Sequence, residues 1–447
     1  MRIECHVDPR QATATRFAVV RLRAENGADL GQLDVEYSRL LPLGRPGPLA
    51  LDLLLLASAV YAIDKLVARS TAGDGWTRDF ELRVPASDPG RWSGAANAIN
   101  ECLSFLTGDR WTVEFSELRS RLARPGGRRR RGVRRPAGES VCLFSGGLDS
   151  LVGTIDHLEE HGDERVLLIG HHDGQMPGPL SDQRALLPLL MRAYPDRVSA
   201  VLPRVGHSGT AQELTLRGRS LVFVALGVFA AAAQGEGTPV LIPENGTIAL
   251  NPPLTPARRG SCSTRTAHPH YLDLLRRVLS TIGLDHPLSN PLAQKTKGEV
   301  VVGCRNRELV HSLAQLTVSC AKRGHTRNWP NRTAGSCGCC MPCIYRRAAL
   351  HAAGLDTEPY GADICSGEVD LDNPGLEAPN DLRAFLSFLR AEHSAQRIGS
   401  MLLANGSLDP GRVPESAALV RRTMEEVQAL LRAKATPEVR RRAGIRD

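Results

Sequence analysis

Hydrophobic and polar positions along residues 1–123 follow two different periods. Alternation with a period of two predicts strands, and apolar residues recurring every three to four positions predict helices. By this criterion the segment contains strands at 15–23, 32–41, 76–84 and 110–115 and helices at 48–69 and 88–106. This mixture indicates an α+β module, and no residue pattern in it points to a particular chemistry.

From residue 137 short apolar strands alternate regularly with helices. The strands are expected at 141–144, 165–170, 198–203 and 238–243, and the helices at 150–161, 181–193 and 218–234. Such alternation predicts a doubly wound parallel sheet with helices on both faces. Ligands bind these sheets at the carboxyl ends of the strands, so the loops after the strands are where a site is expected.

The predicted fold is therefore α/β and has four parts. They are an N-terminal α+β module (1–123), an arginine-rich linker (124–136), the parallel-sheet domain (137–363) and a helical C-terminal extension (364–447). The extension is expected to hold helices at 382–392 and 416–433, both with charged faces. A chain of 447 residues exceeds what one hydrophobic core usually organises, which agrees with several domains.

The net charge of +8 is concentrated in the linker, where seven arginines fall between positions 124 and 135. Glycine, proline and clustered like charges make a packed helix there unfavourable. The segment is interpreted as a solvated hinge, in preference to an arm that binds RNA or another polyanion. Aromatic residues make up 4% of the chain, which argues against a stacking platform for single-stranded nucleic acid.

Targeting and membrane signals are not found in the sequence. The first residues contain an acid and no apolar stretch of the kind that a secretory signal has. The most apolar run, 51–67, is interrupted by Asp52, Asp64 and Lys65, so it is expected to be a buried amphipathic helix and not a membrane span. Eleven cysteines, four of them within seven positions, indicate metal binding and not a disulfide framework. We therefore expect a cytoplasmic protein.

The sharpest local signal is a phosphate-type loop between the strand at 141–144 and the next helix. It consists of Ser145, Gly146, Gly147, Leu148, Asp149 and Ser150. Paired glycines allow close approach of backbone N–H groups to a phosphate, and a helix N-terminus adds its positive dipole end. Asp149 would repel phosphate and is expected to hold Mg²⁺. Because no lysine follows, the loop is not that of ATPases that cleave the γ-phosphate. The alternative is a tight strand-to-helix turn with a serine cap.

A cysteine cluster gives the second strong signal. Its four thiolates are Cys320, Cys337, Cys340 and Cys343, with Cys339 as a spare. Four thiolates close a tetrahedral zinc site and leave no position open for water, so the expected Zn²⁺ would stabilise structure. An iron–sulfur cluster is the alternative.

Residues 140–360 resemble a known family. Ser-Gly-Gly-Leu-Asp-Ser is similar to the PP-loop of ATP pyrophosphatases, whose sheet is of the adenine nucleotide alpha hydrolase type. The cysteine spacing, the segment Thr296-Lys-Gly-Glu299 and the ending Gly354-Leu-Asp-Thr-Glu-Pro-Tyr360 resemble 7-cyano-7-deazaguanine synthase, the QueC family. The added N- and C-terminal segments and the motifs at 244–246 and 263–269 look more like the enlarged QueC-like proteins of anti-phage defence (QatC type).

The resemblance implies an ATP-dependent carbon–nitrogen ligase that uses ATP and Mg²⁺. A 7-deazaguanine-type carboxylate would be adenylated, then amidated, converted to a nitrile, or transferred to a protein partner encoded in the same operon. Arg219 would bind ATP phosphates or the substrate carboxylate, and Lys297 would stabilise charge as pyrophosphate departs. For nearby Arg217, a surface arginine at a helix end is the alternative.

Further substrate contacts are expected from the loops after the strands. Glu244 would hydrogen-bond a guanine-type base edge, and Asn245 either contacts substrate or forms an Asn-Gly turn. Arg265 lies in the polar stretch 261–269, which is either a cover over ATP or a surface loop. His171 and His172 follow the second strand and receive no role.

Two other classes of function stay open. One is an RNA-modifying pyrophosphatase that uses the arginine linker as an RNA-binding arm. The other is a non-catalytic, partner-binding subunit of a defence complex that keeps the loop as a nucleotide sensor.

Overall fold

A computed structural model describes residues 1–8, 17–119, 122, 135–175, 178–255, 265–372 and 380–446. Most of the arginine linker (124–134) and positions 261–264 of the proposed cover lie outside the described residues. The chain forms two compact units that alternate along the sequence. The first unit comprises Met1–Ser145, Gly162–Ile242 and Ser263–Ser289, and the second comprises Gly146–His161, Pro243–Cys262 and Asn290–Asp447.

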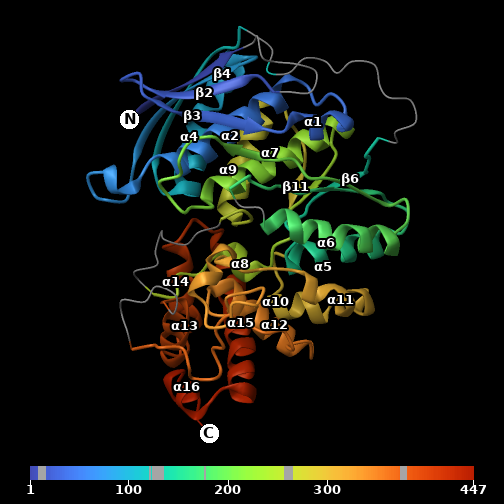
Figure 1. The fold of residues 1–447 in the computed structure, drawn as a ribbon, viewed down its shortest axis with the longest axis vertical. Coiled ribbons are helices and arrows are strands. Elements are labelled where there is room, and N and C mark those ends of the chain that lie inside the picture. Colours follow the sequence, from blue (N-terminus) through green and yellow to red (C-terminus); the bar gives the residue numbers. More distant parts are fainter. Residues whose placement is uncertain are drawn as a thin grey trace. The chain divides into compact units, whose positions relative to one another are not determined.

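The first unit contains a six-stranded mixed sheet in the order β5-β4-β1-β2-β3-β9 (Figure 1). Its strands are β1 (Arg2–Asp8), β2 (Val19–Ala24), β3 (Asp29–Val35), β4 (Asp79–Ala86), β5 (Arg110–Glu117) and β9 (Val205–His207). β1, β4 and β5 run parallel, whereas β2, β3 and β9 pair in antiparallel fashion. Alternate residues such as Phe80 and Leu82 are buried, as expected for a sheet with one face on the core.

A second, fully parallel sheet in the same unit has the order β11-β10-β6-β7-β8. Its strands are β6 (Ser140–Leu143), β7 (Val166–Ile169), β8 (Val198–Val201), β10 (Val240–Leu241) and β11 (Leu288–Ser289). In chain order this is 3-2-1-4-5, so the winding direction reverses between β6 and β10. Such a reversal is where open α/β sheets bind ligands.

Helices complete the first unit, and the N-terminal segment is an integral part of it. They are α1 (Tyr37–Leu40), α2 (Pro48–Leu66), α3 (Pro89–Gly94), α4 (Ala96–Thr107), α6 (Gly178–Ala193), α7 (Arg217–Gln234) and α9 (Pro269–Ile282), with 3₁₀ turns at Leu41–Leu43 and Arg69–Thr71. α2 packs against α7, and β9 pairs with β3. The segment 1–123 and part of the predicted parallel-sheet domain therefore share one compact unit.

The second unit is helical among its described residues. It contains α5 (Leu148–Glu160), α8 (Gly246–Leu250), α10 (Lys297–Val302), α11 (Arg307–Leu313), α12 (Met341–Ala352), α13 (Asn380–Arg390), α14 (Ala395–Leu403), α15 (Val413–Lys434) and α16 (Pro437–Arg442), with 3₁₀ turns at Ala314–Leu316, Arg323–Asn328 and Pro410–Arg412. α15 packs on α12, α14 and α16. Their apolar faces enclose a core that includes Ile344, Phe385 and Leu430.

The α/β class and the parallel sheet predicted from sequence are confirmed, with local corrections. The helix expected at 88–106 is two helices, α3 and α4, because the helix is interrupted at Ala95. The strand expected at 32–41 ends at Val35. The helix at 48–66 is buried on nearly all sides and not only on one face. Strands β1, β9 and β11 were not predicted.

The domain boundaries predicted from the sequence stay predictions. Residues 137–363 contribute to both compact units, and the predicted extension 364–447 belongs to the second.

Candidate functional site

The phosphate-type loop at 145–150 contains a glycine turn, Gly146-Gly147, whose backbone conformation favours glycine. Gly146 has a φ of 82°, in the left-handed region, which a residue with a Cβ adopts only at a cost. Gly147 is the N-cap of α5 and has no side chain with which to cap that helix. The helix begins at Leu148, two residues earlier than expected, so Asp149 and Ser150 lie in its first turn. A thirteen-residue helix that starts on a glycine-rich turn is suited to an anion at its N-terminus.

Within the turn, Ser150 is oriented inward. Its hydroxyl donates to the carbonyl of Gly147 at 2.9 Å, and its side chain is buried. The carbonyl of Gly146 accepts from the backbone N–H of Val318 at 3.2 Å, which fixes the turn from outside. Ser145, by contrast, is exposed.

Asp149 is the point where predicted site residues meet. Its Oδ1 accepts from Lys297 Nζ at 2.7 Å, and its Oδ2 accepts from Asn245 Nδ2 at 2.8 Å and from the backbone N–H of Asn245 at 3.4 Å. The side chains of Lys297 and Asp149 are 5% and 13% exposed, so this ion pair is largely withdrawn from water. Hydrogen bonds from the described residues use three of the roughly four lone-pair directions of this carboxylate.

Asn245 is a structural link and is fully buried. Its Oδ1 accepts from the backbone N–H of Ile248 and so caps α8, while its Nδ2 holds Asp149. The amide is therefore used at both ends. Half-buried Glu244, the neighbouring predicted substrate ligand, has its backbone fixed on both sides by the side chain of Asn290.

The predicted cysteine ligands come together as expected. The Sγ atoms of Cys320, Cys337, Cys340 and Cys343 all lie within 4.8 Å of one another, a set that could hold a zinc ion. Backbone N–H groups of Lys322, Cys337 and Cys340 donate to these sulfurs at 3.3 Å.

The loop that presents these cysteines depends on one glycine. Gly338 has a φ of 82°, and a Cβ there would lie 2.2 Å from the carbonyl oxygen of Ala362. Cys339 lies next to the cluster, 3.9 Å from Cys337 Sγ, but is not one of the four converging sulfurs.

The residues that follow the cysteines form a buried ion-pair network. Arg346 is fully buried and binds both carboxylate oxygens of Glu358 at 2.8 and 2.9 Å. Arg347 pairs with Asp356 at 3.3 Å, and Tyr360 donates to the same carboxylate at 3.2 Å. The motif residues around the cysteines thus hold α12 and the segment after it together.

Arg219, in the first unit, is bound to a histidine that sequence reasoning left without a role. Its Nε donates to His171 Nδ1 at 3.2 Å, and its Nη2 donates to the carbonyl of His171 at 3.3 Å. His171 Nε2 lies 2.9 Å from the carbonyl of Val205, so that nitrogen carries the proton. Burial lowers the pKa of His171 to about 3 and lowers the pKa of Arg219.

Asp173, which follows the same strand, forms a second buried cluster. Its Oδ2 accepts from Tyr61 at 2.8 Å and from Lys65 at 2.9 Å, and both donors come from α2. The run His171-His172-Asp173 directly after β7 was the signal that could have indicated this cluster. The donors on α2 carry no such signal, because their spacing fits an ordinary buried helix.

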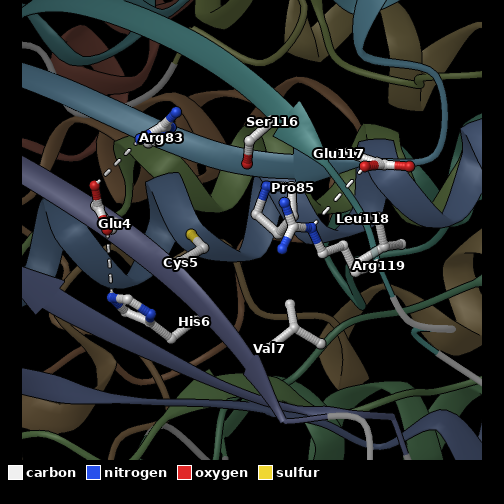
Figure 2. Close-up of a pocket in the computed structure, with 10 residues that line it drawn as sticks. All are labelled: Glu4, Cys5, His6, Val7, Arg83, Pro85, Ser116, Glu117, Leu118 and Arg119. Atoms are coloured by element: carbon white, nitrogen blue, oxygen red, sulfur yellow. Dashed lines mark ion pairs between the residues drawn. The ribbon is translucent and has the colours of Figure 1, made fainter.

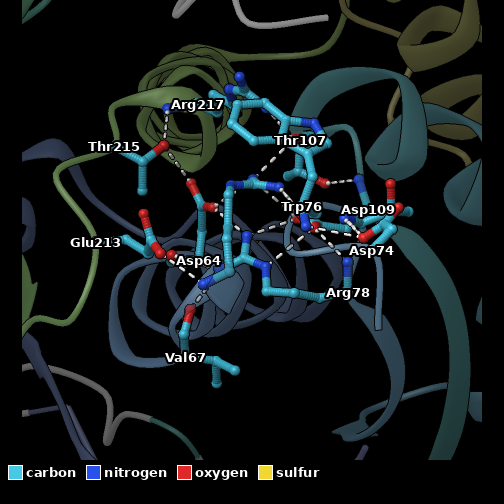
Figure 3. A network of polar contacts seen from close by, with 12 residues as sticks. Asp64, Val67, Asp74, Trp76, Arg78, Thr107, Asp109, Glu213, Thr215 and Arg217 are labelled. Carbon is cyan, nitrogen blue, oxygen red and sulfur yellow. Dashed lines mark hydrogen bonds and ion pairs between the residues drawn. The ribbon is translucent and has the colours of Figure 1, made fainter. Parts of the chain in front are cut away.

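The N-terminus of α7, which carries Arg219, is already occupied by a carboxylate. Asp64 Oδ2 accepts from the backbone N–H of Gly218 at 3.2 Å and from Thr215 Oγ1 at 2.9 Å. Figure 3 shows Asp64 beside Arg78 and Asp109, two further buried members of this network. Arg78 Nη2 lies 2.7 Å from Asp64 and 2.6 Å from Asp109. Asp64 therefore stands where an external anion would bind this helix end.

Two more arginines belong to the same region of the first unit. Arg217 donates to the carbonyl of Thr107 at 2.6 Å, and burial lowers its pKa to about 10. It is buried, unlike the surface arginine considered from sequence. Arg265 stacks on the Phe105 ring at 4.2 Å and donates to the Phe105 carbonyl. Both arginines thus bind carbonyls at the end of α4.

A shallow hollow of about 250 Å³ lies on the six-stranded sheet, at the carboxyl ends of parallel strands β1, β4 and β5 (Figure 2). Glu4, which lines it, lies 3.5 Å from His6 and 3.7 Å from Arg83. These three side chains are roughly half exposed and already paired with one another, and none of the predicted site residues lines the hollow.

Comparison with protein-family models, with curated proteins and with solved structures finds no match to this chain. Among the described residues, no helix combines the length and apolar character that crossing a membrane requires.

Proposed function

We propose that this protein is an ATP pyrophosphatase-type enzyme that activates a small-molecule carboxylate as its adenylate. The observation that carries the proposal is the ion pair between Asp149 and Lys297. Asp149 lies in the first turn of α5, a helix that begins at a left-handed glycine turn. A helix N-terminus, a carboxylate and a lysine are the three kinds of group that bind phosphates and their counter-ion.

In this proposal the backbone around Gly146 and Gly147 binds phosphate oxygens of ATP. Asp149 would hold Mg²⁺, and the cation would neutralise charge on the phosphates. Lys297 would stabilise the negative charge that develops as pyrophosphate leaves. Asn245 keeps Asp149 in place through its amide. The substrate carboxylate attacks the α-phosphate, the bond to pyrophosphate breaks, and an acyl-adenylate results.

The substrate class rests on the resemblance to 7-cyano-7-deazaguanine synthase. A 7-deazaguanine-type carboxylate is proposed, with ammonia or an amine of a protein partner displacing AMP, and with an anti-phage system as the setting. The four-cysteine cluster supports the resemblance, because its ligands are those that the family motif requires. In this role Zn²⁺ would hold the segment at 320 to the start of α12.

Pyrophosphate release tests the proposal directly. The full-length protein is incubated with MgATP and 7-carboxy-7-deazaguanine, and Lys297→Ala is compared with Lys295→Ala. Lys295 is a suitable control because it lies two residues away and its side chain is 43% exposed. We expect Lys297→Ala to lower kcat about 100-fold or more, as loss of a group that stabilises developing charge does, and Lys295→Ala to retain activity. Absence of pyrophosphate release by the unaltered protein, or equal losses in both variants, would contradict the proposal.

A further inference from the structure

One face of helix α15 contacts the two helices that present the partners of Asp149: α8, which Asn245 caps, and α10, which begins at Lys297. The face consists of Leu419, Arg422, Thr423 and Glu426, at the spacing of successive helical turns. Thr423 Oγ1 lies 2.5 Å from Thr247 Oγ1 on α8, the helix that Asn245 caps. Leu419 also lies against α8, beside Gly246. Arg422 and Glu426 reach α10, which begins at Lys297, and the turn before it.

Glu426 makes the closest of these contacts. Its carboxylate accepts a short hydrogen bond from Thr296 Oγ1 and a second, of 3.1 Å, from the backbone N–H of Gly298. The residues before and after Lys297 therefore bind the same carboxylate. A Cβ at Gly298 would lie 2.4 Å from Glu426 Oε1, so glycine is needed there for this approach.

The neighbouring contacts strengthen this arrangement. Thr296 also forms a capping box with Glu299, and Arg422 binds Glu299 Oε1 at 2.7 Å. Burial raises the pKa of the Glu426 carboxyl, and the hydrogen bonds from Thr296 and Gly298 act against that rise. A carboxylate at the N-terminus of another helix stabilises that helix through its positive dipole end.

We propose that Glu426 is a positioning residue that holds Lys297 against Asp149, and that α15 is thereby part of the site. The catalytic consequence rests on the proposed function, but the positioning does not. The helical extension after residue 364 is then a working part of the enzyme and not only a surface for partners. Glu426 of this extension acts on Lys297 through Thr296 and Gly298, at the N-terminal turn of α10.

Chemical labelling of lysines tests the positioning without any nucleotide. The full-length protein carrying Glu426→Ala, Glu426→Gln or Glu425→Ala is treated with acetic anhydride, and each lysine is followed by mass spectrometry. Glu425 is the matched control because it is the exposed neighbour on the same helix. Lys434, at the end of α15 and paired with Asp356 at 2.5 Å, reports whether the whole helix has loosened.

We expect Lys297 to be labelled about fivefold faster in Glu426→Ala, the ratio that corresponds to about 1 kcal/mol of helix-end stabilisation. Glu426→Gln should give an intermediate rate, because its amide oxygen can still accept one of the two hydrogen bonds. Lys434 labelling should stay unchanged. Equal Lys297 labelling in Glu426→Ala and Glu425→Ala, with helical circular dichroism retained, would overturn the positioning role.

Kinetics separate this inference from the proposed function. With an active unaltered protein, Glu426→Ala should lower kcat for pyrophosphate release and change KM for ATP less, since Lys297 would act on the departing charge. Faster labelling with unchanged kcat would overturn the catalytic consequence. If no variant or unaltered protein turns over ATP, the proposed function fails, and the labelling still decides whether Glu426 positions Lys297.

Discussion

The buried pair between Asp149 and Lys297 gives a stability prediction that needs no substrate. Removing the carboxylate with Asp149→Ala leaves an ammonium group that is 5% exposed without the carboxylate it is paired with. At 2.7 Å and an effective dielectric constant of about 20, the direct attraction is about 6 kcal/mol. Desolvation of both groups offsets part of this value, and breaking a buried pair usually costs about 3–5 kcal/mol. Because Asp149 is 13% exposed, we expect about 3 kcal/mol.

A double-mutant cycle isolates the pair. Lys297→Met removes the charge but keeps an apolar chain of similar length, so Asp149→Ala/Lys297→Met should be more stable than the sum of the single changes implies. We expect a coupling free energy of about 2 kcal/mol. Urea-dependent hydrogen exchange, followed by mass spectrometry on peptides from α5 and α10, measures local stability in the second unit.

Additive single changes, or a cost below about 1 kcal/mol for Asp149→Ala, would show that the pair is not formed in solution. The geometric basis of the proposed nucleotide site would then be lost. Lys295→Met serves as the control, because its contact with Asp156 is longer, at 3.9 Å, and more exposed.

Two further predictions concern metal and pH. Cys337→Ser should lose bound zinc in elemental analysis, whereas Cys339→Ser should keep it, because the sulfur of Cys337 is one of the four that converge and that of Cys339 is not. Bound iron with visible absorbance would instead indicate an iron–sulfur cluster. The pKa of His171 is about 3 in the folded protein against about 6.5 when unfolded, so between these values only the unfolded chain gains the proton. The contribution of His171 to the free energy of unfolding should therefore be fully present above pH 6.5 and fall as pH drops toward 3. His171→Gln should reduce this pH dependence in urea unfolding. An unchanged pH dependence would contradict a buried neutral imidazole.

The local features of this protein are written in short stretches of sequence. The period of apolar residues determines most strands and helices, because a strand or helix buries one face at a fixed spacing. The glycine turn at 145–150 and the four metal-type cysteines are equally local, since each needs particular residue types a few positions apart. These signals gave the α/β class, the turn and the ligand set.

The partners of the charged groups were decided by the tertiary structure. Asp149 binds Asn245 and Lys297, which lie 96 and 148 positions further along the chain. Asp64 caps α7 across 154 positions, and Glu426 caps α10 across 128. No period in the sequence encodes such pairings.

The same reason explains why the terminal segments were interpreted as additions. Helix α2 was expected to be amphipathic, but tertiary packing buries it on nearly all sides and gives Lys65 its carboxylate partner. The spacing of apolar residues tells which face of a helix can be buried, but it does not tell what covers the other faces. Desolvation forces every buried charge to find a counter-charge or donor, and only the packed chain determines which one lies within reach.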